Sequence, residues 1–288
     1  DSLWIVFNGE IFNYIELRED LLAKGHSFRT HSDTEVIVHL YEEYGPDFVT
    51  QLNGQFAIAI WDKNKEELFL ARDRVGIRPL YYTQAGESFV FASEIKALME
   101  FPGISPKLSA KGLSEYFTFW TSLSPNTVFE DIYEVPPGTY MILTENSRNS
   151  VTFWELPIYK PEEYNNLNLD EAVTEFEKLF ADSIKLRLRA DVQVGAYLSG
   201  GIDSSVTTSF IKNTHPDNLR TFSIGFSEQD YDESSYQNEA SAYFKTEHSS
   251  IICNPNEIAE EFKNVVWHCE APLLRTAPTP MSLLAKSV

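Results

Sequence analysis

The stretch AYLSGGIDSSV, residues 196–206, decides the fold of the second half of this 288-residue chain. An apolar run from Val194 to Leu198 ends at a serine and two glycines, and Asp203 and two more serines follow at once. This change from apolar residues to glycines and then to capping residues is typical of a buried strand that turns sharply into a helix. The stretch therefore predicts a strand, a tight turn and a helix in direct succession.

The residues around this stretch continue the same pattern. A long helix is expected just before it, because apolar residues from Val173 to Leu188 recur at three- and four-residue steps. Strands are expected at 192–198, 219–226 and 249–253, each followed by a helical stretch. Strands that alternate with helices predict an α/β domain with a doubly wound parallel sheet.

The glycine turn has the features of a phosphate-binding loop. Ligands of such sheets bind beyond the carboxyl ends of the strands, and Gly200 and Gly201 let the backbone approach a ligand closely. The start of the following helix favours phosphate, and hydroxyl groups can donate to it from Ser199, Ser204 and Ser205. Asp203 suits a Mg²⁺ ion that bridges phosphates. The other interpretation is a plain turn in which Asp203 or Ser204 caps the helix.

The first half of the chain follows a different pattern. Helices are expected at 13–24 and 32–45, and four strands follow in close succession. Within 54–62 apolar residues fall on both faces, which predicts a strand in a sheet covered on both sides. Residues 3–7 are expected to form a buried strand that ends at a polar turn, Asn8-Gly9-Glu10. These elements predict an α+β layered domain.

A polar, turn-rich stretch near 144–168 predicts a linker between the halves. We therefore expect one domain over residues 1–157 and a second over 158–288. Both ends of the chain are abrupt, since an apolar strand begins at once and the last helical pattern stops midway. We expect an internal piece of a longer protein.

The composition limits the partners and the compartment. The net charge is −20, from 23 basic and 43 acidic residues. Such a balance repels phosphate backbones and anionic lipid, so neither nucleic acid nor a membrane is expected as a partner. No apolar run approaches the roughly 18 residues of a membrane span. The two cysteines, Cys253 and Cys269, suit a reducing compartment, and a cytoplasmic location is expected.

Several stretches together resemble one known family. SGGIDSS resembles the pyrophosphate-binding loop of the ATP pyrophosphatases, and RLRADVQVGAYLSGGIDSS resembles the glutamine-hydrolysing asparagine synthetases. The resemblance continues, in the family's order, in FNGEIFNY, SDTEVIVHLYEEYG, LNGQFAIAIWD, ARDRVGIRPLYY, FASEIKAL and VPPGTY. It covers the chain from residue 5 to its end. Gln193 departs from the family, which usually has proline there, in a loop without a chemical role.

The resemblance implies a class II glutamine amidotransferase domain of the N-terminal-nucleophile type, followed by an ATP-pyrophosphatase domain, both incomplete. It implies glutamine, aspartate and ATP as small-molecule substrates, Mg²⁺ as the metal, and a homodimer as a candidate assembly. Glutamine would be hydrolysed to ammonia, while aspartate would be activated as β-aspartyl-AMP with release of pyrophosphate. Ammonia would then displace AMP to give asparagine.

In the first domain the resemblance assigns Asn8 and Gly9 to an oxyanion hole that binds glutamine. An amide side chain and a backbone N–H can converge on one developing negative charge. Glu10 and Asp33 would hold the α-amino group of glutamine, although Asp33 also has the sequence position of a plain helix cap. The family's nucleophilic cysteine would lie upstream of Asp1, outside this chain.

In the second domain the resemblance assigns one contiguous loop to pyrophosphate, namely Ser199, Gly200, Gly201, Asp203, Ser204 and Ser205, with Asp203 as the Mg²⁺ ligand. Leu198 and Ile224 would line the adenine pocket, although their spacing alone fits ordinary core residues, and Glu270 would lie near the active site. ARDRVGIRPLYY is expected to be a structural hairpin that turns at Gly76. HCE, residues 268–270, is not expected to bind metal, because no second Cys or His cluster has zinc spacing.

Two further interpretations stay open. One is a related β-lactam-forming or peptide-cyclising synthetase without glutaminase activity, against which the intact Asn8-Gly9-Glu10 argues. The other is a non-catalytic interaction module, against which the intact SGGIDSS loop with Asp203 argues.

Overall fold

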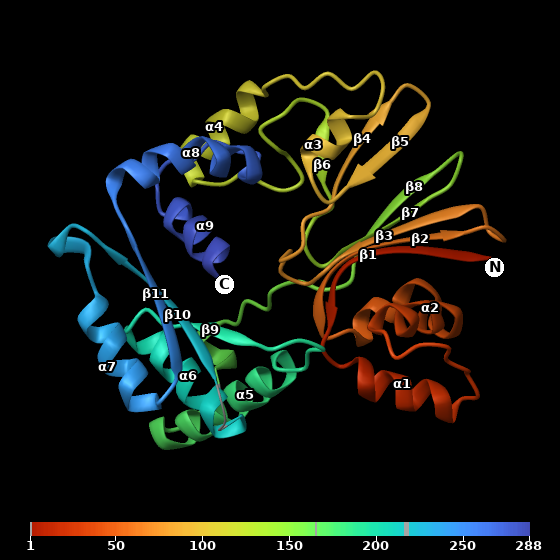
Figure 1. Cartoon of the computed structure of the whole chain (residues 1–288). Helices are drawn as coiled ribbons and strands as arrows, with labels where there is room; N and C mark the ends of the chain where they lie inside the picture. Colours follow the sequence, from red (N-terminus) through yellow and green to blue (C-terminus); the bar gives the residue numbers. More distant parts are fainter. Residues whose placement is uncertain (1, 165, 216–218) are drawn as a thin grey trace. The chain divides into compact units, whose positions relative to one another are not determined.

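The computed structural model describes residues 2–164, 166–215 and 219–288 (Figure 1). The chain forms two compact units, Asp1–Glu162 and Glu163–Val288. Within the described ranges, no helix combines the length and the apolar character that crossing a membrane requires.

The first unit contains two antiparallel sheets. Its strands are β1 (Leu3–Ile11), β2 (Gly54–Asp62), β3 (Glu67–Arg72), β4 (Tyr81–Ala85), β5 (Ser88–Ala92), β6 (Ile132–Glu134), β7 (Thr139–Leu143) and β8 (Arg148–Thr152). Its α-helices are α1 (Tyr14–Ala23), α2 (Asp33–Tyr44), α3 (Ile95–Met99) and α4 (Ala110–Phe119). The larger sheet has the order β1-β2-β3-β7-β8, and the smaller has the order β5-β4-β6.

The two faces of β2 explain how this unit is layered. Phe56, Ile58 and Ile60 are fully buried against α1 and α2, which cover one face of the larger sheet. Ala57 and Ala59 point the other way and pack towards the smaller sheet (Figure 1). Helix α3 covers the outer side of the smaller sheet. The result is a helix–sheet–sheet–helix arrangement, which confirms the layered α+β prediction.

Strand β1 differs from its sequence prediction in two respects. It runs to Ile11, so Asn8-Gly9-Glu10 are strand residues paired with β2 and not a turn. It is also an edge strand, in which Trp4 and Val6 are 64% and 68% exposed and not buried. Trp61 lies opposite Trp4 and is half exposed too, because the core on this face ends at Ala59.

The stretch ARDRVGIRPLYY crosses between the sheets and does not form the expected hairpin. Strand β3 pairs with β2 and β7, whereas β4 pairs with β5 and β6. The buried Asp73 carboxylate accepts the N–H groups of Phe56, Val75, Ile77 and Arg78. Arg72 donates to the carbonyls of Gly76, Arg78 and Val135 and pairs with Glu134. These side chains are structural, as expected, because they hold the backbone that joins the two sheets.

The second unit confirms the parallel α/β prediction. Its elements are α5 (Leu169–Arg187), β9 (Gly195–Tyr197), α6 (Ile202–Thr214), β10 (Arg220–Phe226), α7 (Ser234–Phe244), β11 (Glu247–Cys253), α8 (Pro255–Cys269) and α9 (Pro278–Ser287). The strands are all parallel, in the order β11-β10-β9. Figure 1 shows α5, α6 and α7 on one side of this sheet and α9 on the other. Strand β9 is shorter than the expected 192–198.

The polar stretch near 144–168 is only partly irregular. Residues 148–152 form β8 and pair with β7, which the polar composition did not predict because β8 is an exposed edge strand.

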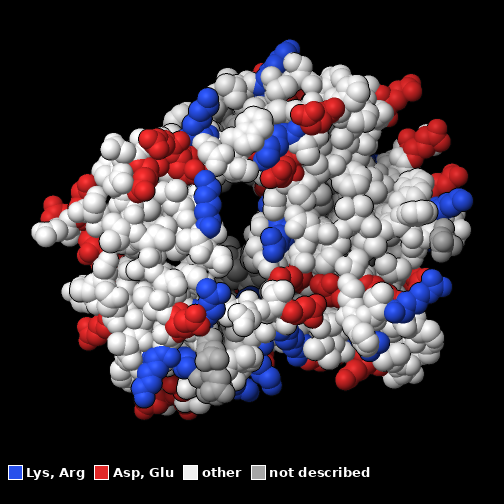
Figure 2. All heavy atoms as spheres, viewed as in Figure 1, with Lys and Arg blue, Asp and Glu red and all other residues white. Residues whose placement is uncertain are grey.

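Figure 2 shows acidic side chains spread among basic ones over the face in view. The net charge of −20 is therefore not gathered into one acidic patch on that face.

Candidate functional site

The glycine loop joins the carboxyl end of β9 to the first turn of α6. The N-cap of α6 is Gly201, which has no side chain to cap the helix, and the first helical residue is Ile202. Asp203 is therefore in the first turn, is exposed, and does not cap its own helix. Its carboxylate makes no hydrogen bond or ion pair with the described residues. The first N–H groups of α6 have no intrahelical partner, so they and Asp203 face solvent together.

The serines of this loop differ in their contacts. The Ser204 hydroxyl accepts the Ser199 N–H at 3.2 Å and lies 3.2 Å from the Gly201 carbonyl. The Ser199 and Ser204 hydroxyls are 2.9 Å apart. The backbone N–H of Ser205 makes the first helical bond, to Gly201. Ser204 thus closes the loop on itself, which fixes the loop before any ligand arrives.

The two glycines are needed for different reasons. Gly200 has φ +82°, and a Cβ there would lie 2.8 Å from the backbone of Tyr236 and Gln237 in α7. Gly201 has an ordinary φ of −77°, and its Cβ would meet only the Ser199 hydroxyl, at 3.5 Å. The packing of α7 therefore requires Gly200, whereas the space beside Gly201 is open.

Leu198 and Ile224, the predicted adenine contacts, differ in burial at this sheet edge. Leu198 is fully buried, its N–H donates to Phe222 at 2.9 Å, and its carbonyl accepts from the buried Ser223 hydroxyl. Ile224 is half-buried within β10, and its carbonyl accepts the Gln237 side-chain amide at 2.8 Å. Leu198 offers no exposed side-chain surface to a ligand.

Asp232 and Ser234 are a pair at the carboxyl end of β10 that sequence reasoning missed. The Asp232 carboxylate accepts the Ser234 hydroxyl at 2.6 Å and the Phe226 N–H at 3.1 Å. These hydrogen bonds hold the pKa of Asp232 below its usual value, and the one from the Ser234 hydroxyl has the larger effect. The only sequence signal is an Asp-x-Ser just after a predicted strand, and it fits a helix cap equally well.

Glu270, the acidic residue expected near the active site, lies one residue after α8 in a left-handed conformation.

In the first unit, the open edge of β1 carries the predicted glutamine contacts. Gly9 lies opposite Phe56, whose N–H and carbonyl are both bound by Asp73 on the far side. Gly9 is therefore a non-hydrogen-bonded position of the antiparallel ladder, and its N–H points away from β2. Since β1 is an edge strand, this N–H faces the open edge of the sheet.

Asn8 and Gly9 are both fixed by close neighbours. The Asn8 side-chain amide donates one hydrogen to the Ser93 hydroxyl at 3.0 Å, which leaves its second N–H for another acceptor. A Cβ on Gly9 would lie 2.0 Å from the Gln55 carbonyl, so only glycine lets β1 and β2 approach this closely.

Asp33 lies at the same edge and is not the helix cap. Ser32 caps α2 by accepting the Thr34 N–H at 3.1 Å. Asp33 instead accepts the N–H of Ile11 at 3.0 Å, two residues along β1 from Gly9. Residues two apart on one strand are about 6.7 Å apart, so the carboxylate lies near the Gly9 N–H. The exposed Glu10 carboxylate contacts the Gln55 side chain at 3.4 Å.

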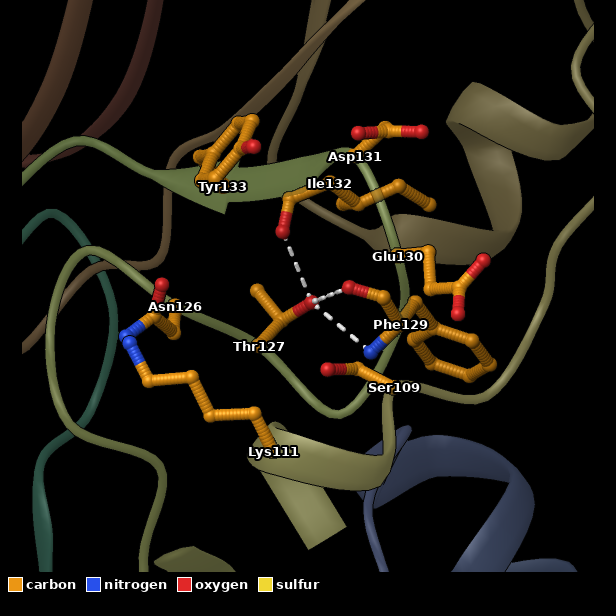
Figure 3. Close-up of a pocket in the computed structure, with 9 residues that line it drawn as sticks. All are labelled: Ser109, Lys111, Asn126, Thr127, Phe129, Glu130, Asp131, Ile132 and Tyr133. Carbon is orange, nitrogen blue, oxygen red and sulfur yellow. Dashed lines mark hydrogen bonds between the residues drawn. The ribbon is translucent and has the colours of Figure 1, made fainter.

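A hollow of about 250 Å³ in the first unit lies apart from these residues (Figure 3). The Thr127 hydroxyl in its wall contacts the carbonyls of Phe129 and Ile132 and accepts the Phe129 N–H. That hydroxyl is occupied by the fold, and none of the predicted site residues lines the hollow.

Two family models match the chain. The model of the glutamine amidotransferase domain matches residues 1–154, and the model of asparagine synthase matches residues 175–288. The chain belongs to the glutamine-hydrolysing asparagine synthetase family. The family accounts for the order of the two units, with the layered sheets first and the parallel sheet second.

Individual relatives agree with this family. Asparagine synthetase [glutamine-hydrolyzing] 1 of Bacillus subtilis is 38% identical and covers 99% of this chain. A putative asparagine synthetase of Methanocaldococcus jannaschii is 37% identical over 93% of the chain, and an amidase of Penicillium rubens, chyE, is 32% identical over 95%. The chain spans 44%, 52% and 42% of these proteins, about half their length.

Solved structures show a more distant likeness. A glutamine phosphoribosylpyrophosphate amidotransferase from B. subtilis is 17% identical, with a TM-score of 0.39, and covers 88% of this chain and 61% of its own. A glutamine aminotransferase class-II domain protein from Silicibacter pomeroyi covers 53% of this chain with a TM-score of 0.32.

Proposed function

We propose that the protein is part of an enzyme that makes asparagine from aspartate, using ATP and ammonia released from glutamine. Membership of the synthetase family supports this proposal. The observation that carries it is the presence in one chain of two prepared sites, the N–H groups at the open edge of β1 and the exposed loop before α6.

At the first site, Asn8 and Gly9 stabilise the oxyanion that forms when the glutamine amide is attacked. The Gly9 N–H and the free hydrogen of the Asn8 amide are fixed donors, so little reorganisation is needed as charge develops. Glu10 and Asp33 place two carboxylates near this edge for the ammonium group of glutamine. The edge position of β1 supports this role, because a central strand would have used the Gly9 N–H in the sheet.

At the second site, the bare N–H groups of the first turn of α6 bind the pyrophosphate part of ATP. Gly201 keeps the backbone accessible, and Ser199 supplies a hydroxyl. The described residues also fit a magnesium ion, because Asp203 is an exposed carboxylate without a partner beside these donors. Mg²⁺ would neutralise charge on the phosphates, and Asp203 is the residue that would hold it. The adenine contact is assigned to Ile224, because the side chain of Leu198 is buried.

Aspartate is the proposed acceptor, which ATP converts to β-aspartyl-AMP. The relatives include proteins named as asparagine synthetases and one named as an amidase, so the experiment compares aspartate with other acceptor acids. The cytoplasm is the proposed compartment, because the unpaired Cys253 and Cys269 suit a reducing environment.

The test is amino-acid-dependent exchange of labelled pyrophosphate into ATP, measured with the full-length protein and each of the twenty amino acids in turn. We expect aspartate alone to support exchange, and glutamine or ammonium to convert aspartate to asparagine with one AMP released. Exchange with another acid and none with aspartate would refute the assigned acceptor while leaving the ATP site intact. Absence of exchange with every acid would refute the ATP site as well.

A further inference from the structure

Two histidines and a glutamate that are distant in sequence meet beside α2. His26 follows α1, whereas His39 and Glu42 are on α2, one turn apart. The two imidazole Nδ1 atoms are 3.1 Å apart, and the Glu42 carboxylate lies 3.0 Å from Nδ1 of His39. The three donor atoms all lie within 4.8 Å of one another. The residues sit at the surface, with 16% and 17% of the two histidine side chains exposed.

The outer nitrogens of both imidazoles face other carboxylates. Nε2 of His26 lies 3.2 Å from Glu43, and Nε2 of His39 lies 3.8 Å from Glu35. A neutral imidazole carries one proton, and a facing carboxylate favours that proton on the near nitrogen. Glu43 therefore favours the proton of His26 on Nε2, whereas His39 has a carboxylate beside each nitrogen, Glu42 at 3.0 Å from Nδ1 and Glu35 at 3.8 Å from Nε2.

Two imidazole nitrogens and a carboxylate oxygen thus meet at one place. Nδ1 of His39 lies 3.1 Å from Nδ1 of His26 and 3.0 Å from the Glu42 carboxylate, and the three ligand atoms all lie within 4.8 Å of one another. A proton can join two of the three atoms, whereas a divalent metal ion can join all three.

The spacing fits a metal ion of tetrahedral geometry. Ligand atoms at 2.0–2.1 Å from a tetrahedral zinc are about 3.3 Å apart, and the two separations that involve Nδ1 of His39 differ from that by about 0.3 Å. Two imidazoles and one carboxylate are a common zinc ligand set, which leaves a fourth position for water. Metal-bound histidines usually donate their other N–H to a carboxylate, as Glu43 and Glu35 allow here.

The surroundings hold these groups in place. The Phe28 ring packs edge-on against His39, with the ring centroids 4.5 Å apart. Glu35 is fixed by the N–H groups of Arg29 and Thr30. The Lys24 ammonium group pairs with the Glu43 carboxylate at 2.7 Å. Three carboxylates therefore face one ammonium group, a balance that favours a divalent cation.

We propose that His26, His39 and Glu42 form a zinc-binding site that joins the end of α1 to the middle of α2. His26 lies on the loop between α1 and Asp33. A bound ion therefore holds this loop in the conformation in which the Asp33 carboxylate accepts the Ile11 N–H of β1. The sequence does not show this site as a zinc motif, because twelve residues and a change of direction separate His26 from His39.

The test is calorimetric titration of chelator-treated protein with zinc chloride, with circular dichroism to verify folding. We expect one zinc ion per chain in the wild type and a melting temperature that rises with zinc. His26→Gln and His39→Gln should each weaken binding by more than about tenfold, and Glu43→Gln by roughly tenfold, because a carboxylate that holds the outer nitrogen of a metal-bound histidine contributes that much. Glu42→Gln, at an exposed position, keeps the test valid if a histidine variant does not fold.

His31→Gln is the matched control, since His31 is exposed, lies on the same loop and is outside the cluster. It should bind zinc like the wild type. Visible absorption of bound Co²⁺ provides a second measurement, which should show nitrogen ligands in the control and lose them in His39→Gln. Unchanged stoichiometry and affinity in both cluster-histidine variants would overturn the proposal, and so would the absence of zinc binding to the wild type.

Discussion

Asp203 and Ser204 are neighbours in the first turn of α6, yet their side chains contact different things. The Ser204 hydroxyl contacts the backbone of its own loop at Ser199 and Gly201, whereas the Asp203 carboxylate contacts none of the described residues. A polar group that the fold satisfies contributes to stability, and an exposed one without a partner is available to a ligand. The two residues should therefore respond differently to substitution.

Asp203→Asn should lower aspartate-dependent pyrophosphate exchange by about a hundredfold or more, because metal stabilisation of charge is worth several kcal/mol. Glutamine hydrolysis should not change. Exchange and glutaminase assays on the full-length protein check both expectations, with the exposed Asp182→Asn as the control. Exchange at the wild-type rate would show that Asp203 does not hold the metal.

Asn8→Ala should slow glutamine hydrolysis by roughly 10²–10³, the usual effect of losing one oxyanion-hole donor. Synthesis from free ammonium should continue at the wild-type rate, because ammonium bypasses this site. Ser93→Ala removes only the hydroxyl that positions Asn8, so its effect should be smaller. Equal losses with glutamine and with ammonium would mean that Asn8 has a structural role.

Sequence alone could identify the contiguous residues of the candidate site and not those brought together by folding. Asp203 and its loop were predictable because seven adjacent residues carry the pattern. Asp232 and Gln237 reach the same sheet edge only because α7 packs back on β10. No local pattern encodes that contact, and the meeting of His26 with His39 has the same origin.

At the scale of elements, the β9–α6 loop is shaped by α7 as much as by its own sequence. Gly200 lies against the α7 backbone, while Gly201 faces open space. On the sequence alone these adjacent glycines are equivalent. The strands were predictable over their full length where both faces are buried, as in β2, whereas at the sheet edges only residues 3–7 of β1 were predicted and β8 was not.

Gly200→Ala should destabilise the second unit by about 2–3 kcal/mol, because the methyl group forces α7 away. Gly201→Ala should change stability by less than about 1 kcal/mol, since its φ is ordinary and its surroundings are open. Urea unfolding followed by circular dichroism checks both values. The Gly201 variant should nevertheless lose nucleotide binding, because its methyl group occupies the space proposed for pyrophosphate. Equal stability losses in the two variants would contradict this account.

At the scale of the whole molecule, the chain consists of two units that build their cores separately. The segment between β8 and α5 carries large apolar side chains without burying them. Ile158 is 89% exposed, and Tyr159 and Tyr164 are 61% and 62% exposed. We propose that the domain boundary lies in this segment.

Brief digestion should therefore cut this segment first. Chymotrypsin should cleave after Tyr159, because backbone without helix or strand structure enters a protease active site readily, whereas trypsin should spare Lys160, which Pro161 follows. Mass spectrometry of the early products should show two fragments that meet near residue 160. A first cut inside either unit would place the boundary elsewhere.

The two glycines before α6 also bear on how such chains diverge. A descendant that abandoned nucleotide chemistry but kept its architecture would still be selected for Gly200, since α7 leaves no room for a side chain there. Nothing in the packing would preserve Gly201, which would drift to alanine or serine. Among paralogues, retention of the second glycine is thus the marker of a working ligase, and the first glycine marks only the scaffold.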